Sequence, residues 1–319
     1  FSEKERVMPP VAFHKRAYVP LEQASIGIMT HAFHYGTGIF EGIRGNWNDE
    51  EERIVIFRIR EHYERLLRGC SLLHIKLPYS VDELCEITVE MVERSGYRED
   101  IYIRPLAYKS TERVATLNLH TLDDDFTVFA IPFGAYMDLE AAAHCCTSSW
   151  RRLEDTMIPP GAKISGMYVN SILAKSDAVA AGFDEALLMN QAGYVCEGTG
   201  ENLFILRNGK LATPPLEDNV LPGITRDTVM DIARNEMGLE VEERHILRTE
   251  LYLVDELFLT GTAAHLTPVG MVDHRSIGEG KMGPVTRELQ TMYFDIVRGK
   301  SPAYRHWWTL AIPRLEVTA

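Results

Sequence analysis

Residues 185–212 read EALLMNQAGYVCEGTGENLFILRNGKLA, and this stretch decides the fold of the second half of the chain. Two apolar runs lie on either side of Asn190-Gln-Ala-Gly193, and the next two are separated by Asn208-Gly209. Asn-Gly is a strong hairpin signal because both residues tolerate positive φ. Strands joined by such short turns pair antiparallel, so we expect antiparallel hairpins at 185–197 and 203–212.

Helical and strand patterns alternate along the rest of the chain, which favours a mixed α/β fold. Ser80 and Glu83 form a capping box that opens a helix, and Gly96 closes it. The other expected elements are strands at 53–57, 101–108 and 126–133, and helices at 61–75, 225–237 and 284–297.

The segment Pro132-Phe-Gly-Ala-Tyr136 follows an apolar run and combines Pro with Gly, which is typical of a connection between domains. A chain of 319 residues has the length of about two domains. We expect a small N-terminal α/β domain at 1–131, a linker at 132–143, and a larger C-terminal domain with antiparallel hairpins and helices at 144–319. The fold class is therefore α/β, of the α+β type.

The charge balance argues against several kinds of partner. The chain has 46 acidic and 33 basic residues, a net charge of −13, so neither nucleic acid nor an anionic membrane surface is an expected partner. The sequence has no apolar run long enough for a transmembrane helix and no signal-peptide pattern, so we expect a cytoplasmic protein. The five cysteines lack metal-ligand spacing, which favours buried free thiols and no metal site.

The motif Gly278-Glu-Gly-Lys-Met-Gly283 matches the glycine pattern of dinucleotide-binding loops, but its position excludes that role. A dinucleotide site needs the loop early in a βαβ unit, with an acidic residue about 20 positions further on. Here Pro284 follows at once and the chain soon ends. We interpret the motif as a loop that leads into a helix beginning at Pro284.

Lys163 is the first candidate catalytic residue. It lies in a small, mainly uncharged segment, Pro159-Pro-Gly-Ala-Lys-Ile-Ser-Gly166, directly before a helical pattern. Desolvation disfavours the ammonium form of a lysine and frees the amine for Schiff-base chemistry. An exposed loop lysine is the alternative if this segment is considered alone.

Three further segments complete the candidate site: Glu197-Gly-Thr-Gly-Glu-Asn202, Leu221-Pro-Gly-Ile-Thr225 and Gly261-Thr-Ala-Ala264. The second opens a helix, and helix N-termini bind anions such as phosphate. Pyridoxal phosphate requires a lysine, a carboxylate for its ring nitrogen and a cradle for its phosphate. The sequence offers all three.

These motifs resemble those of fold-type IV pyridoxal-phosphate enzymes, and most closely those of branched-chain amino acid aminotransferases. The matching segments follow the family order and lie at 31–44, 57–62, 102–105, 162–163, 197–204, 221–227 and 261–264. The resemblance implies a two-domain fold-type IV structure. It also implies ping-pong transfer of an amino group between leucine, isoleucine or valine and 2-oxoglutarate, in a homodimer or larger homo-oligomer.

The resemblance assigns roles to individual residues. Lys163 forms the Schiff base and carries the proton, Glu197 faces the ring nitrogen, and Tyr168 donates to the phenolic oxygen. Arg60 binds the phosphate, unless the strand register places Arg58 there instead. The remaining cofactor-binding residues implied are Gly200, Leu221, Gly223, Ile224, Thr225, Gly261 and Thr262.

The substrate pocket implied by the resemblance must accept both an apolar side chain and the γ-carboxylate of glutamate. Arg104 serves that carboxylate, and the amides of Thr262 and Ala263 hold the α-carboxylate. The pocket residues are Tyr35, Phe40, Tyr102, Arg104 and Tyr136. Tyr102 and Arg104 are two positions apart on an expected strand and so share a face.

The sequence departs from the family pattern at His265, at Met167 and over 114–125, and these departures affect the substrate range. D-amino acid and R-amine transaminases share the fold, as does a lyase of the aminodeoxychorismate type, which needs no acceptor keto acid. A non-catalytic cofactor-binding protein is a further alternative. Intact Lys163 and Glu197 argue against the last.

Overall fold

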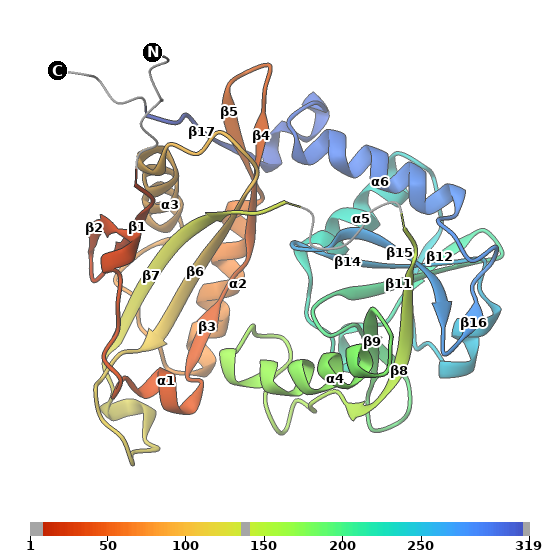
Figure 1. Ribbon diagram of the computed structural model, residues 1–319, viewed down its shortest axis with the longest axis horizontal. Coiled ribbons are helices and arrows are strands. Elements are labelled where there is room, and N and C mark those ends of the chain that lie inside the picture. The colour runs from red at the N-terminus through yellow and green to blue at the C-terminus, as the bar shows by residue number, and fades with distance from the viewer. Residues whose placement is uncertain (1–8, 135–140, 315–319) are drawn as a thin grey trace. The chain divides into compact units, whose positions relative to one another are not determined.

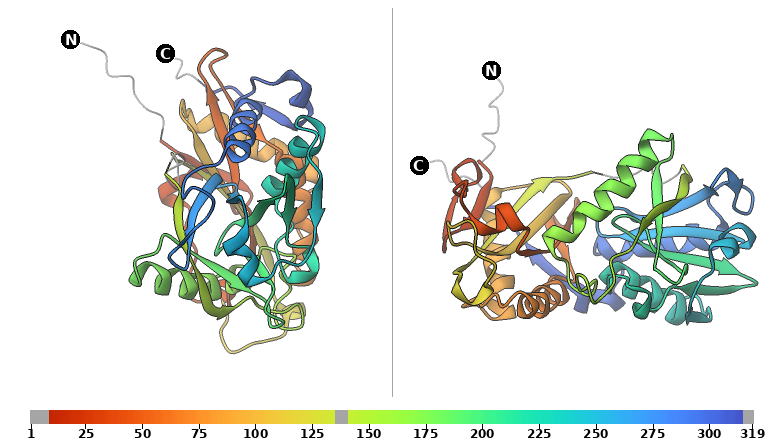
Figure 2. Two further views of the ribbon diagram at one scale, coloured as in Figure 1. Left: turned by 90° about the vertical axis from the view of Figure 1, so that its right-hand side faces the viewer. Right: turned by 90° about the horizontal axis from the view of Figure 1, so that it is seen from below.

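The computed structural model describes residues 9–134 and 141–314, and its contacts divide the chain into two compact units (Figures 1 and 2). Unit 1 takes in the chain up to Gly134, Lys163–Gly166 and the chain from Asp295 onward. Unit 2 consists of two stretches, from the end of the first part of unit 1 to Ala162 and from Met167 to Phe294. The division after Gly134 falls within the connection expected at 132–143.

Unit 1 is built on an eight-stranded antiparallel sheet in the order β17-β5-β4-β6-β7-β1-β2, with β3 paired to β6 (Figure 1). Its strands are β1 (Val11–His14), β2 (Ala17–Pro20), β3 (Gly38–Phe40), β4 (Ile43–Asn48), β5 (Arg53–Phe57), β6 (Ile101–Lys109), β7 (Asp124–Pro132) and β17 (Trp308–Ala311). Strands β5, β6 and β7 confirm the three expected strands.

Helices α2 (Ile59–Leu72) and α3 (Val81–Ser95) pack against each other and against this sheet, while α1 (His31–Tyr35) is a single short turn. The capping box at Ser80 and Glu83 is present, and Gly96 ends α3 with φ of 64°. A left-handed residue at this position is the usual way to end a helix, and glycine adopts it without steric cost.

The last part of the chain departs from expectation. Residues from Asp295 onward were expected in the C-terminal domain but belong to unit 1. Strand β17 pairs antiparallel with β5, from Trp308 opposite Phe57 to Ala311 opposite Ile54. This pairing covers the edge of a strand that is apolar after Arg53 and whose Ile54, Val55 and Ile56 are completely buried. An uncovered edge of that kind invites aggregation.

Unit 2 contains a six-stranded barrel, β10-β9-β8-β15-β14-β11, closed by the pairing of β10 with β11. Strands β12, β13 and β16 extend it. The bounds are β8 (Ala143–Arg151), β9 (Glu185–Met189), β10 (Val195–Glu197), β11 (Asn202–Arg207), β12 (Lys210–Thr213), β13 (Val241–Glu243), β14 (Glu256–Gly261), β15 (His265–Val272) and β16 (Arg275–Ser276). Both expected hairpins, β9–β10 and β11–β12, are confirmed as antiparallel.

Strand β9 shows how the barrel is filled. Leu187 and Met189 belong to the central apolar cluster of the barrel strands, whereas Ala186 and Leu188 pack with Ala174 and Ala178 of α4 (Tyr168–Ala180). This is the alternation of faces that a strand imposes. Helix α5 (Ile224–Asn235) belongs to unit 2, as does α6 (Pro284–Val297) up to Phe294, and α6 begins at Pro284 as expected.

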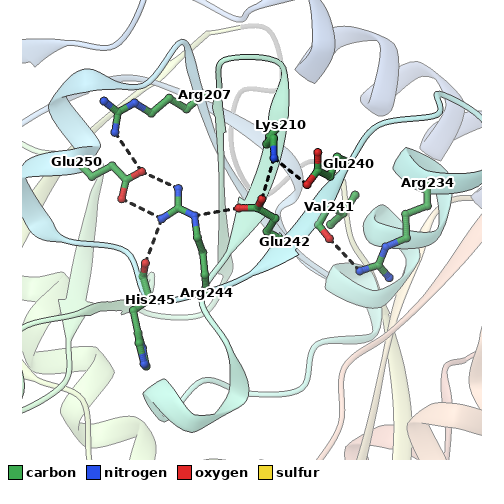
Figure 3. A network of polar contacts seen from close by, with 9 residues as sticks. All are labelled: Arg207, Lys210, Arg234, Glu240, Val241, Glu242, Arg244, His245 and Glu250. Atoms are coloured by element: carbon green, nitrogen blue, oxygen red, sulfur yellow. Dashed lines mark hydrogen bonds and ion pairs between the residues drawn. The ribbon is translucent and has the colours of Figure 1, made fainter.

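The parallel pair β12–β13 is supported by a network of charged side chains (Figure 3). Lys210 Nζ contacts Glu240 at 2.8 Å and Glu242 at 3.3 Å, while Arg244 contacts Glu242 and Glu250. Exposed pairs of this kind contribute little individually, so the network fixes the position of the edge strand more than it adds stability. No helix in the described part of the chain is long and apolar enough to cross a membrane.

Candidate active site

Lys163 lies in unit 1 beside strand β3. The amide of Phe40 donates to the carbonyl of Lys163 at 3.1 Å, and Ile164 forms a β-bridge with Ile39. The Lys163 ammonium lies 5.3 Å from the centroid of the Phe40 ring. The lysine side chain is half-buried rather than exposed, which agrees with the desolvated setting expected from its small neighbours.

A buried charged cluster adjoins this strand in unit 1. Glu41 is fully buried and accepts from Nε and Nη2 of Arg65, both at 2.7 Å, and from Nδ1 of His62 at 2.8 Å. Burial would raise the pKa of Glu41, but Arg65 and the hydrogen bonds from His62 and Arg65 outweigh it and hold the pKa well below its usual range. Burial lowers the pKa of His62, and the charges of Arg65 and Lys163 act in the same direction. Glu41 therefore stays charged while His62 favours its neutral form.

Three expected substrate residues are brought together in unit 1. The Arg104 guanidinium lies 4.6 Å from the centroid of the Phe40 ring and donates from Nη2 to the Tyr102 hydroxyl at 3.2 Å. Its buried Nε forms no hydrogen bond within the described part of the chain. The Tyr102 hydroxyl occupies the space that a side chain at Gly42 would need. An arginine with an unused buried donor is suited to bind a carboxylate.

Tyr35 and Tyr136 complete the expected substrate set. Tyr35 is the last residue of α1, is exposed, and its hydroxyl accepts from the amide of Ala115 at 3.0 Å. His31 is buried next to it, with ring centroids 4.5 Å apart. Tyr136 lies outside the described residues.

The structure corrects the geometry expected around Arg60. The chain does not continue as a strand after Phe57 but turns into α2 at Ile59, which places Arg60 on the exposed face of this helix, ion-paired with Asp82. Arg58, the alternative, is buried, with φ of 50°, and its Nε donates to Glu61 at 2.8 Å. Its guanidinium lies 4.7 Å from the centroid of the Trp307 ring.

Glu197 in unit 2 is a buried carboxylate with three donors. Its Oε1 contacts Nη2 of Arg152 at 2.6 Å, and its Oε2 accepts from Nδ2 of Asn202 at 2.9 Å and from the amide of Leu221 at 3.0 Å. Arg152 is itself fixed by a bond from Nε to the carbonyl of Asn219 at 3.0 Å. Charged and polar donors of this kind keep a buried carboxylate ionised. Arg152 was not predicted, because nothing in the local sequence marks it.

Helix α5 begins beside this carboxylate. Gly223 is the N-cap and makes no side-chain capping bond, and the buried residues Ile224 and Thr225 form the first turn. Asn202 donates to the carbonyl of Leu221 at 2.9 Å, and its Oδ1 fills the space that a side chain at Gly223 would take. Gly223 thus brings no side chain to the N-terminus of this helix, and helix N-termini are suited to bind anions.

The other expected cofactor residues also belong to unit 2. A Cβ on Gly261 would lie 3.4 Å from the carbonyl oxygen of Gly200, so these two loops run side by side. Thr262 and Ala263 follow in the tight turn between β14 and β15, and His265 opens β15 with φ of 54°. Tyr168 is the first residue of α4 and is half-buried.

Each unit holds groups of the kinds that pyridoxal phosphate needs. Unit 1 supplies a half-buried amine at Lys163 and a buried guanidinium at Arg58. Unit 2 supplies a buried carboxylate at Glu197 and the glycine-capped N-terminus of α5. An amine for the aldehyde, a carboxylate for the pyridine nitrogen, and cationic and amide donors for the phosphate are the groups the cofactor needs.

Comparison with known proteins shows the family of this chain. Residues 38–272 match the amino-transferase class IV family, and the chain belongs to this family. Among its relatives is the probable branched-chain-amino-acid aminotransferase of Aquifex aeolicus, which is 49% identical over 298 residues, or 93% of this chain and 96% of the relative.

Solved structures of the same kind share the fold. The branched-chain amino acid aminotransferase of Thermobaculum terrenum in its PLP form has a TM-score of 0.91 and 38% identity, covering 96% of this chain and 99% of that one. The branched-chain aminotransferase of the thermophilic archaeon Thermoproteus uzoniensis with norvaline has a TM-score of 0.90 and 42% identity, covering 94% of this chain and 98% of that one.

Proposed function

We propose that this chain is a pyridoxal-phosphate-dependent branched-chain amino acid aminotransferase, which transfers an amino group between leucine, isoleucine or valine and 2-oxoglutarate. The observation that carries the proposal is the grouping of Phe40, Tyr102 and Arg104 beside Lys163. Aromatic rings suit an aliphatic side chain, and a single guanidinium with a spare donor suits the γ-carboxylate of glutamate. One site can therefore serve both halves of a ping-pong reaction.

Lys163 and Glu197 carry the chemistry. When bound, the cofactor supplies the aldehyde that links to the amine and the ring that accepts the electrons released at the substrate Cα. Lys163 moves the proton between the substrate Cα and C4′ of the cofactor. Glu197 keeps the pyridine nitrogen protonated, and its bonds to Arg152, Asn202 and Leu221 keep its carboxylate charged and fixed.

The phosphate is held by the first turn of α5, with the amides of Ile224 and Thr225, and by the hydroxyl of Thr262. Arg58 replaces Arg60 as the phosphate arginine in this proposal. Both arginines have an acidic partner, Glu61 for Arg58 and Asp82 for Arg60, so burial is what distinguishes them. A guanidinium shielded from water forms stronger bonds to phosphate than an exposed one. Tyr168 donates to the phenolic oxygen of the cofactor.

A second copy of the chain completes the enzyme in this proposal. Ile28, Phe33 and Leu117 are 82%, 68% and 83% exposed. They lie in segments that contact each other, because Nε2 of His31 bonds to the carbonyl of Thr116 at 2.9 Å. Large exposed apolar side chains gathered in this way are typical of a protein interface. A symmetric dimer would bury them.

The absorbance spectrum of the purified protein tests the function directly. L-leucine should convert the bound cofactor to its amine form, and 2-oxoglutarate should restore it. Conversion by D-alanine or an R-amine, but not by L-leucine, would favour the related transaminases instead. Turnover without an acceptor keto acid would favour a lyase. The cytoplasmic location stays a prediction.

A further inference from the structure

The turn from Gly198 to Gly200, between β10 and β11, rests on two buried carboxyl groups that the proposed chemistry does not use. Glu185, the first residue of β9, is completely buried. Its Oε1 accepts from the Thr199 hydroxyl at 2.8 Å, and its Oε2 accepts from Nζ of Lys175 at 2.7 Å. The middle residue of the turn is therefore tied to β9 through a charged acceptor.

Glu201 holds the same turn from its other end. Its side chain is buried and folds back so that Oε2 accepts from the amide of Gly200 at 3.1 Å, while its carbonyl accepts from the amide of Gly198 at 2.7 Å. A Cβ at residue 198 would lie 2.7 Å from this Oε2. The carboxyl thus occupies the space that the glycine leaves, and it fills the inside of the turn.

The two carboxyl groups have different surroundings. Glu185 is paired with the Lys175 ammonium. Burial, and then the nearby charge of Glu185, raise the pKa of Glu201 to about 8, with Glu197 acting in the same direction. The Gly200 amide and Lys175 oppose the shift without cancelling it. Cys145 of β8, the other titratable neighbour, has its own pKa raised by burial and by these acids.

We propose that Glu201 and Glu185 are positioning residues for Glu197: their side chains hold the 198–200 turn, and the turn holds the carboxylate that faces the cofactor ring. The role of Glu197 in this inference rests on the proposed function. The direct link is short, since Glu197 is the residue before the turn and pairs with Asn202 just after it.

The inference predicts how the protein responds to alkali. In the unfolded chain a glutamate ionises near 4.5, whereas Glu201 in the fold retains its proton to about pH 8. Between these two pH values the folded state thus binds more protons than the unfolded state, so the contribution of Glu201 to folding stability falls as pH rises from 4.5 to 8. The folding equilibrium constant changes by up to about tenfold per pH unit in this range, and the contribution is constant above pH 8. Above pH 8 two charged carboxylates share one buried space, and the turn should loosen.

The test compares the holoenzyme with Glu201→Gln, which keeps the shape and cannot ionise, and with Glu217→Gln, an exposed control in the same unit. Two quantities are measured: the melting temperature between pH 5 and 9, and the rate of pyridoxal phosphate release at pH 7.5 and 9.5. We expect Glu201→Gln to flatten the pH dependence of melting. For each protein the rate of cofactor release at pH 9.5 is divided by the rate at pH 7.5. We expect this ratio to be about tenfold larger in the unsubstituted protein and in Glu217→Gln than in Glu201→Gln.

Equal alkaline acceleration of release in all three proteins would overturn the inference, even if melting differed, because a purely structural acid would affect melting alone. Thr199→Val provides an independent test if Glu201→Gln does not fold. Loss of the bond to Glu185 should speed cofactor release by about two- to tenfold, and an unchanged rate would contradict the proposal. A protein that purifies without bound cofactor would contradict the proposed function instead, and the melting comparison would still test the carboxyl pair.

Discussion

Arg104 is the residue on which the substrate range depends most. Its stacking on Phe40 and its bond to Tyr102 leave Nε as a spare donor. We expect Arg104→Ala to remove about 1.5–3 kcal/mol of transition-state stabilisation for glutamate and 2-oxoglutarate, which lowers their kcat/KM by about one to two decades. The kcat/KM for leucine should fall much less. Single-turnover rates with L-leucine and L-glutamate measure this difference.

The control for Arg104→Ala is its melting temperature. A buried structural arginine would, on removal, lower stability and both half-reactions together. Equal loss for leucine and glutamate would therefore remove Arg104 from the dicarboxylate role.

Glu197 tests the electronic part of the mechanism. Glu197→Gln keeps the side-chain shape but removes the negative charge that stabilises the protonated pyridine nitrogen. The loss of rate should therefore appear in the chemical step rather than in substrate binding. Rapid-mixing measurements of the half-reaction with L-leucine report that step. If the half-reaction rate is unchanged at full cofactor occupancy, Glu197 does not have this role.

The sequence can reveal a site residue only where the residues next to it in the chain mark it as unusual. Lys163, Glu197 and Gly223 stand in segments of small residues, and this local composition makes them site candidates. In the structure Lys163 is half-buried and Glu197 is buried among hydrogen-bond donors, while their roles stay predictions. Arg152 and Glu201 could not be found in this way, because their importance comes from partners far along the chain or from burial. Arg60 was misplaced because a strand was assumed where the chain had already turned into α2.

At the scale of elements, the start of α5 is where helix and site meet. Gly223→Ala would place a methyl group against Oδ1 of Asn202, the residue whose Nδ2 donates to Glu197 and to the carbonyl of Leu221. We expect a loss of cofactor affinity of about tenfold or more, since such overlaps force side-chain shifts worth about 1–3 kcal/mol. Cofactor titration followed by absorbance measures the loss.

Gly134→Ala serves as the matched control, because a Cβ at Gly134 meets nothing within 4 Å. A cofactor affinity for Gly223→Ala equal to that of Gly134→Ala would mean that the N-terminus of α5 does not hold the phosphate.

Elements fixed by local chemistry were predictable, and elements fixed by distant partners were not. The Asn208-Gly209 turn, with φ of 52° and 75°, follows from two residues, as does the capping box of α3. The parallel pairs β8–β9, β8–β15 and β12–β13 join strands far apart in sequence. A hydrophobic pattern specifies which face of a strand is buried, not which strand lies beside it.

For the whole molecule, the exposed apolar residues of unit 1 predict self-association. Leu117→Glu places a charge in the proposed interface and should shift the protein toward monomer, which sedimentation or light scattering measures. Leu253→Glu is the control, because Leu253 is also exposed but belongs to unit 2 rather than to unit 1. Equal association states for the two variants would place the interface elsewhere.

The covalent link between the cofactor and Lys163 tests the central claim most directly. Borohydride reduction of the purified protein, followed by digestion and mass spectrometry, identifies the lysine that carries the cofactor. We predict a yellow protein whose label lies on the peptide containing Lys163, and a Lys163→Ala variant that binds cofactor without a covalent bond and does not turn over. A label on Lys109 or Lys175, or no label on a protein that still transaminates, would contradict the account.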